Sequence, residues 1–325
     1  MEALSRLVID YAECQGVCAA GIATLETLAD GPPSSDLTSV LPEAKSAITF
    51  AFPLNQELIL PFLSKKDRRA HEKVNIDTNA LAGGVSLQLA KWLDQKGYPS
   101  LPQAPNDVYR QDTPGGALDM LPEISHRYLA VRSGIGHFGL SGNVITQDHG
   151  AAVILGCVIT TADLIPTDPL PETDNYCDAC RMCMASCASG FMSDEEKTTI
   201  QLGGHSFEYS RRKSYLRCEY VCGGFTGLHA GGKWSTWSPG RFPIPDSDEA
   251  FLPAIIQGVK TYSHRPEITG GYHHSLMPGT KLWLTCGNCQ LVCHPDKEER
   301  RKRHRTLKES GVVIQHPDGK LEGVP

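Results

Sequence analysis

Seven of the chain's twelve cysteines fall into two short groups, and this arrangement constrains the fold more than any other feature. The first group has the spacing C-x2-C-x2-C-x3-C and the second has C-x2-C-x3-C. They comprise Cys177, Cys180, Cys183 and Cys187, and then Cys286, Cys289 and Cys293. Short spacers of this kind let three thiolates from one turn reach three corners of a cubic iron–sulfur cluster. The fourth thiolate must come from another segment, so we expect the two groups to meet in the folded chain.

The first spacing is typical of bacterial ferredoxins with two 4Fe–4S clusters, in which the last cysteine of the run ligates the other cluster. The predicted ligands of the first cluster are therefore Cys177, Cys180, Cys183 and Cys293. Those of the second cluster are Cys187, Cys286, Cys289 and one of Cys218 and Cys222, which lie between the groups. We favour Cys218 for this last position. The count then closes at eight thiolates for two clusters.

Zinc is the main alternative, because C-x2-C pairs also build tetrahedral zinc sites. A zinc site accounts for four cysteines but not for two interlocked groups with a spare cysteine each, so we favour two clusters. The sequence departs from the ferredoxin run in one respect. Ala188 follows Cys187 and His294 follows Cys293, where proline is common. We expect this departure to affect the loop geometry more than the cluster assignment.

Composition narrows the class of protein further. The chain has 325 residues, enough for about two domains, and 31 basic against 37 acidic residues. A net charge of −6 argues against a protein that coats nucleic acid. No uncharged apolar stretch is long enough to span a membrane, and the first residues lack the pattern of an export signal. We therefore expect a cytoplasmic protein without a membrane partner, whose cysteines are not used for disulfides.

The pattern ahead of the cysteines predicts a mixed α+β domain. Helices are expected at residues 2–13 and 68–97, and strands at 46–53 and 151–161. Gly83 and Gly84 predict a kink or a close helix contact within the longer helix. The proline-rich segment 164–175 predicts a boundary between domains 1–165 and 166–325. The basic run near the C-terminus, at residues 300–305, is interpreted as a solvated helix face.

Several segments together resemble one known family. Residues 127–143 (RYLAVRSGIGHFGLSGN), 41–48 (LPEAKSAI) and 286–293 (CGNCQLVC) are similar to motifs of epoxyqueuosine reductases. The resemblance covers most of the chain, from about Leu7 to Pro295, and extends to the catalytic core of reductive dehalogenases. It implies a nitroreductase-like α+β domain that binds cobalamin, followed by a ferredoxin-like domain with two 4Fe–4S clusters.

The resemblance also implies residues for the corrinoid. A backbone that approaches a large flat macrocycle needs glycine, because a side chain would hold the two apart. The expected corrinoid-binding residues are Arg127, Gly134, Gly136, Gly139, Gly142 and Asn143. On the residues alone, these glycines fit a pair of ordinary tight turns equally well.

The family places a proton-donating acid shortly before this segment. Asp119 lies one position away from the expected acid, and we assign it as the general acid, with Tyr128 as the other candidate donor. The alternative is that Asp119 is an exposed loop residue. A carboxyl group buried beside a corrinoid would have its pKa raised and would carry a proton at neutral pH.

These expectations combine into a reductase that passes electrons through two clusters to cobalt. A ferredoxin- or flavodoxin-like protein is the expected donor, and a small organic molecule is the expected substrate. Epoxyqueuosine reductases carry helical repeats after the second cysteine motif, whereas about thirty residues follow Cys293 here, so tRNA is the less favoured partner. Two other possibilities are an electron-transfer protein that reduces the corrinoid of a partner methyltransferase, and a ferredoxin-type protein with an empty upper domain.

Overall fold

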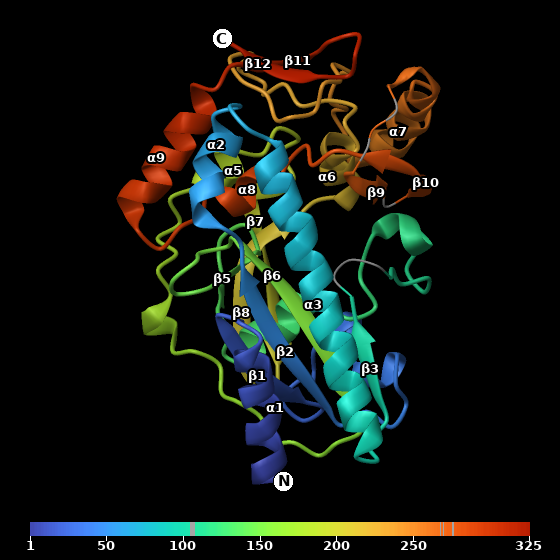
Figure 1. Cartoon of the computed structure of the whole chain (residues 1–325), viewed down its shortest axis with the longest axis vertical. Coiled ribbons are helices and arrows are strands. Elements are labelled where there is room, and N and C mark those ends of the chain that lie inside the picture. Colours follow the sequence, from blue (N-terminus) through green and yellow to red (C-terminus); the bar gives the residue numbers. More distant parts are fainter. Residues whose placement is uncertain (105–107, 267, 269, 275) are drawn as a thin grey trace.

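The computed structural model describes residues 1–104, 108–266, 268, 270–274 and 276–325. Its centre is a four-stranded antiparallel sheet in the order β1-β2-β6-β3 (Figure 1). The strands are β1 (Ala19–Thr24), β2 (Ser46–Pro53), β3 (Ser100–Gln103) and β6 (Val153–Thr160). Strand β2 lies at the middle of the sheet and is buried along nearly its whole length. The expected strands at 46–53 and 151–161 are thus confirmed.

The two faces of the sheet carry side chains of different size. Ile48, Phe50 and Phe52 of β2 face α1 (Glu2–Cys14) and α3 (Arg69–Gln95), and pack with apolar side chains of both helices. Ala47 and Ala51 lie on the opposite face, against α4 (His126–Arg132). Small residues let a helix approach the sheet closely, and this face also receives the hairpin of β7 (Met192–Leu202) and β8 (His205–Arg212).

The long helix α3 runs without interruption through Gly83 and Gly84. A Cβ atom added at either glycine would meet no atom within 4 Å other than its own helix and chain neighbours. The expected close contact is therefore not present, and the helix does not break at this point. Gly97 follows the C-terminal end of the helix with a positive φ of 87°, as a C-cap glycine does.

We expect Gly83→Ala to stabilise the protein by about 0.5–1 kcal/mol. Alanine costs less backbone entropy than glycine in a helix interior, and the added methyl group has space. The thermal midpoint, followed by circular dichroism at 222 nm, should rise. Gly97→Ala is the matched control, because its positive φ strains any side chain and the same substitution should lower the midpoint there.

The C-terminal half is built from short elements. Two helices of one turn, α5 (Met182–Ala185) and α8 (Asn288–Leu291), lie within the two cysteine groups. Among the described residues, the other α-helices are α2 (Ile59–Leu63), α6 (Tyr215–Cys222), α7 (Phe251–Val259) and α9 (Lys297–Lys308). The remaining strands form the hairpins β4 (His137–Phe138) with β5 (Val144–Ile145), β9 (Tyr272–His274) with β10 (Met277–Leu282), and β11 (Val312–Gln315) with β12 (Leu321–Val324).

The hydrophobic cores combine residues from both sides of the expected boundary at 165/166. One core joins Phe62 and Leu63 of α2 to Trp237, Leu291 and Leu307. Another joins the sheet and α4 to the β7–β8 hairpin. The two-domain division stays a prediction, and the two parts pack over shared cores. Across the described part of the chain, no helix has the length and apolar character needed to cross a bilayer.

Candidate metal centre

Four cysteines from two distant segments line one hollow. They are Cys177, Cys180 and Cys183, around α5, and Cys293, which follows α8. Burial, together with negative charge on Cys293, Cys177 and Cys180, raises the pKa of the Cys183 thiol to about 12. Electrostatic coupling of this kind requires the sulfurs to be near one another. The cysteine from the second sequence group, Cys293, therefore lies with the first three.

Hydrogen-bond donors point at these sulfurs. The backbone N–H of Leu140 donates to Sγ of Cys177 at 3.2 Å, and the hydroxyl of Tyr176 lies 3.5 Å from Sγ of Cys293. The Tyr176 ring lies under the guanidinium of Arg300 in α9. Thiolates bound to an iron–sulfur cluster carry negative charge, and donors of this kind stabilise it.

A second set of cysteines lies at the N-terminus of α8 and along α6. The charges of Cys218 and Cys286 act on Cys187, and those of Cys187, Cys286 and Cys218 act on Cys289. Burial is the largest cause of the raised pKa of both Cys187 and Cys289. Cys222 is also here, with its sulfur 3.8 Å from that of Cys218. The structure therefore brings Cys187, the last cysteine of the first sequence group, to the second set.

The glycine-rich segment 139–143 connects the two sets. Leu140 donates to the first set, and the side-chain amide of Asn143 lies 3.8 Å from Sγ of Cys289 in the second. Arg212 at the end of β8 holds this segment through the carbonyl of Ser141 at 3.0 Å and Oδ1 of Asn143 at 2.8 Å. Asn143, which the family resemblance assigned to a corrinoid, thus contacts a cysteine sulfur.

Arg127 and Arg212 both donate to the hydroxyl of Tyr215, each at 3.3 Å. Arg127 also donates to the carbonyl of Gly142 at 2.7 Å. Burial raises the pKa of Tyr215, but the two arginines outweigh it and lower the pKa to about 8. The sequence did not single out Tyr215 for a role. Its only signal is its position three residues before Cys218 at the start of α6.

The glycines expected to line a corrinoid lie against atoms of the protein itself. A Cβ atom at Gly134 would collide with the carbonyl oxygen of Asp168, and one at Gly136 with that of Ile145. At Gly142 it would come within 2.7 Å of the Tyr209 ring. These glycines permit close packing of the chain on itself, and at Gly142 the neighbour is the β7–β8 hairpin. Their role as corrinoid-binding residues stays a prediction.

The two candidate proton donors have local partners. Asp119 ends the 3₁₀ turn η4 (Gly116–Asp119), and its carboxylate accepts the N–H of Gly115 at 2.9 Å. Tyr128 in α4 is half-buried, with its hydroxyl 3.2 Å from that of Tyr209 in β8. Burial is the largest cause of the raised pKa of Tyr128. Asp119 thus stabilises a turn and Tyr128 belongs to an aromatic cluster, and their role as proton donors stays a prediction.

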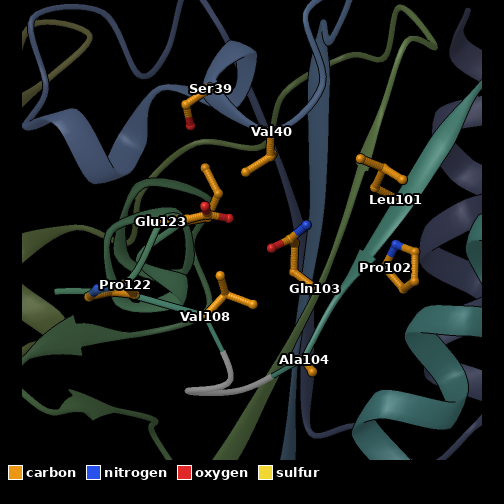
Figure 2. Close-up of a pocket in the computed structure, with 10 residues that line it drawn as sticks. Ser39, Val40, Leu101, Pro102, Gln103, Ala104, Val108, Pro122 and Glu123 are labelled. Atoms are coloured by element: carbon orange, nitrogen blue, oxygen red, sulfur yellow. The ribbon is translucent and has the colours of Figure 1, made fainter. Parts of the chain in front are cut away.

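A pocket of about 460 Å³ opens beside the edge strand β3. Figure 2 shows the carboxylate of Glu123 and the amide of Gln103 turned toward each other across it, between apolar side chains. Pockets of this size with a few polar groups commonly bind small molecules. One wall is formed by residues 122–124, which follow Asp119 closely in sequence.

The basic run of α9 is only partly a solvated face, which corrects that interpretation. Arg300 and Arg303 are 4% and 2% exposed. Arg303 donates to the carbonyl of Leu291 in α8 at 3.1 Å, and Arg300 contacts Asp178 and Tyr176 in the first cysteine loop. The exposed members of the helix include Arg301 and Lys302. The buried arginines therefore hold both cysteine loops to one helix.

Among the described residues, no three histidine, cysteine, aspartate or glutamate side chains are placed to hold a single metal ion. The donor sets are thiols alone, partly or fully buried, and supplied with backbone and side-chain hydrogen-bond donors. Such a donor set suits 4Fe–4S clusters, which are bound by four cysteine thiolates each.

The chain shares sequence with curated epoxyqueuosine reductases. It is 28% identical to the enzyme of Atelocyanobacterium thalassa (isolate ALOHA) over 53% of its own length and 51% of that protein. It is also 28% identical to the enzyme of Gloeobacter violaceus, over 53% of its own length and 49% of the relative. The chain thus spans about half the length of these relatives. No family model matches it.

The fold is shared with a solved reductive dehalogenase. The catabolic enzyme NpRdhA in complex with 3-bromo-4-hydroxybenzoic acid superposes with a TM-score of 0.54 and 11% identity, over 95% of this chain and 34% of that one. At this identity the likeness concerns the fold alone. The chain is therefore similar in sequence to epoxyqueuosine reductases and in fold to a reductive dehalogenase, the two groups to which its motifs pointed.

Proposed function

We propose that the chain is an oxidoreductase that carries electrons through two 4Fe–4S clusters. One observation carries the proposal: the cysteines regroup in space across their sequence groups, with Cys293 beside the first three and Cys187 beside Cys286. Interleaved ligands of this kind are the mark of two-cluster ferredoxins. A zinc ion needs only four ligands around one centre, so a zinc site gives no reason for Cys187 and Cys293 to exchange between the two groups.

On this proposal, Cys177, Cys180, Cys183 and Cys293 hold the first cluster. The second is held by Cys187, Cys286 and Cys289, completed by Cys218 or Cys222. Each cluster supplies one-electron transfer when it is bound. The chain's own residues exclude water and offer donors to the thiolates, as Leu140, Tyr176 and Asn143 do. A small ferredoxin- or flavodoxin-like protein would supply the electrons.

The acceptor is proposed to be a small organic substrate. The resemblance to dehalogenases implies a corrinoid. The space beside three of the glycines assigned to it, however, is occupied by Asp168, Ile145 and Tyr209. We therefore route no step through a corrinoid. We assign the pocket beside β3, where Glu123 and Gln103 face each other, as a candidate site for this substrate.

The content of iron, sulfide and cobalt per chain after anaerobic reconstitution tests this proposal. We expect about eight iron and eight sulfide, which is the content of two 4Fe–4S clusters. A value of about one or two zinc with no sulfide would refute the clusters. Cobalt is measured in the same sample after incubation with cobalamin, and about one cobalt per chain would restore a corrinoid to the proposal.

A second candidate is epoxyqueuosine reduction, which the 28% identity to curated epoxyqueuosine reductases favours. The two candidates differ in their response to RNA. A tRNA stem loop that carries epoxyqueuosine should be reduced by the reconstituted protein on the second candidate, and should be unchanged on the first. An electron carrier for a partner methyltransferase would turn over neither substrate, and would consume electrons only when that corrinoid-containing partner is added.

A further inference from the structure

Two polar side chains in the pocket beside β3 have no partner among the residues that the structure describes. They are the carboxylate of Glu123 and the amide of Gln103, which turn toward each other across the pocket (Figure 2). Pockets that bind small molecules are commonly apolar with a few such polar groups, which fix the orientation of the ligand. The chemistry of the two groups therefore indicates what kind of molecule the pocket takes.

The wall that carries Glu123 is held in place by hydrogen bonds. The backbone N–H of Glu123 donates to the carbonyl of Val108 at 3.2 Å, and Tyr109 pairs with Pro122 in an antiparallel bridge. The hydroxyl of Ser34 also donates to the carbonyl of Pro122, at 2.6 Å. The carboxylate thus belongs to a wall that is already formed, and a ligand does not have to order it.

The polar lining accepts hydrogen bonds more than it donates them. An ionised carboxylate only accepts, whereas the amide of Gln103 both accepts and donates. A third polar group, the hydroxyl of Ser39, already donates to the carbonyl of Asp36 at 2.7 Å, so its oxygen is left as an acceptor. Among the described residues, the lining contains no lysine, arginine or histidine. The ligand must therefore supply the donors.

The nearest arginine in sequence does not neutralise Glu123. The guanidinium of Arg110 donates to the carboxylate of Asp112 and to the carbonyl of Pro33, each at 2.9 Å. A second nitrogen of the same guanidinium lies 2.5 Å from Asp112, so this pair balances its own charge. The charge of Glu123 is left for a ligand to balance.

The rest of the pocket suits the apolar body of a small molecule. Val108 and Leu101 are 54% and 38% exposed, so apolar surface is left uncovered there. Because β3 is an edge strand of its sheet, a peptide strand could in principle pair along it. Pro102 has no N–H to donate, however, and proline in an edge strand limits such pairing. A compact molecule therefore fits this site better than an extended peptide.

We propose that the pocket binds a small organic cation, with its N–H donors on Glu123 and Gln103 and its apolar body against the aliphatic wall. An amidinium presents two parallel N–H groups to a carboxylate, as a guanidinium does, and such charge-assisted bonds are about twice as strong as neutral ones. In identifying this cation as the substrate, the inference rests on the proposed function. Binding of the cation itself does not depend on the clusters.

Benzamidine, benzamide and benzoate are matched probes, because they share one ring and carry a cationic, a neutral and an anionic head. Isothermal titration calorimetry measures their dissociation constants for the reconstituted protein. We expect benzamidine to bind most tightly and benzoate not to bind. Glu123→Gln should weaken benzamidine binding by about tenfold or more, and Glu123→Lys should reverse the preference in favour of benzoate. Glu13→Gln removes an exposed carboxylate of α1 outside the pocket and should change nothing.

The iron content of the same samples separates this inference from the proposed function. If benzoate binds as tightly as benzamidine, if none of the probes binds, or if Glu123→Gln leaves the affinity for benzamidine unchanged, the inference is wrong whatever the iron content. A protein without iron that still selects benzamidine through Glu123 would refute the proposed function and support the cation site.

Discussion

Replacing Cys187 and Cys286 together with alanine should leave about four iron per chain, whereas replacing Cys187 and Cys183 together should leave almost none. The reason lies in the spatial sets. Cys187 and Cys286 come from different sequence groups but lie together, so the double substitution removes ligands from one cluster. Cys187 and Cys183 belong to one sequence group, yet Cys183 lies with Cys293. Their loss therefore affects both clusters.

Iron and sulfide per chain, measured on anaerobically reconstituted protein, check this expectation. Cys14→Ala is the control, because Cys14 is an exposed thiol at the end of α1, and its loss should leave about eight iron. A reversed pattern, with four iron kept in the Cys187 and Cys183 double variant, would mean that each sequence group holds its own cluster. The interleaved arrangement would then be wrong.

The grouping of the cysteines and the positions of the strands could be predicted from the sequence, because both depend on local, regularly spaced residues. The β2 pattern of Ile48, Phe50 and Phe52 needs only the alternation of a strand to predict which side chains share a face. The exchange of Cys187 and Cys293 between sets follows from spacers too short for one turn to surround a cube. Neither prediction required knowledge of distant contacts.

The role of the glycine-rich segment was not readable. A glycine at position 134 or 142 indicates only that some group approaches the backbone closely. A cofactor and another part of the chain leave the same signal in the sequence. The structure shows that the approaching atoms belong to Asp168 and Tyr209, which lie 34 and 67 residues further along. Such contacts depend on how the segment around Asp168 and the β7–β8 hairpin pack against the glycines, and no local pattern encodes that packing.

Charge patterns mislead in a related way. Arg300 and Arg303 lie in a run of basic residues, which is typically solvated, yet both are almost fully buried. Their partners are a carbonyl of α8 and groups of the first cysteine loop, including Asp178. A guanidinium can be buried when its donors are satisfied, and the sequence alone does not list its acceptors.

Arg212→Ala should destabilise the protein by about 3 kcal/mol or more. Its guanidinium donates to the Ser141 carbonyl, the Asn143 side chain and the Tyr215 hydroxyl, and it lies over the rings of Phe191 and Tyr215. Truncation leaves these acceptors without their donor and releases the segment that contacts both cysteine sets. The thermal midpoint of the reconstituted protein, with cluster absorbance followed during the melt, measures the loss.

Arg211→Ala is the matched control, because the neighbouring arginine points to solvent. Its side chain is 48% exposed and pairs with Glu196 on the outside of the β7–β8 hairpin. Exposed ion pairs contribute about 0–1 kcal/mol, so its loss should hardly move the midpoint. Adjacent residues of one strand alternate between faces, and only the inner one reaches the glycine-rich segment. If both variants melt at the same midpoint, Arg212 does not brace that segment. The cluster absorbance would then also begin to bleach at the same temperature in both variants.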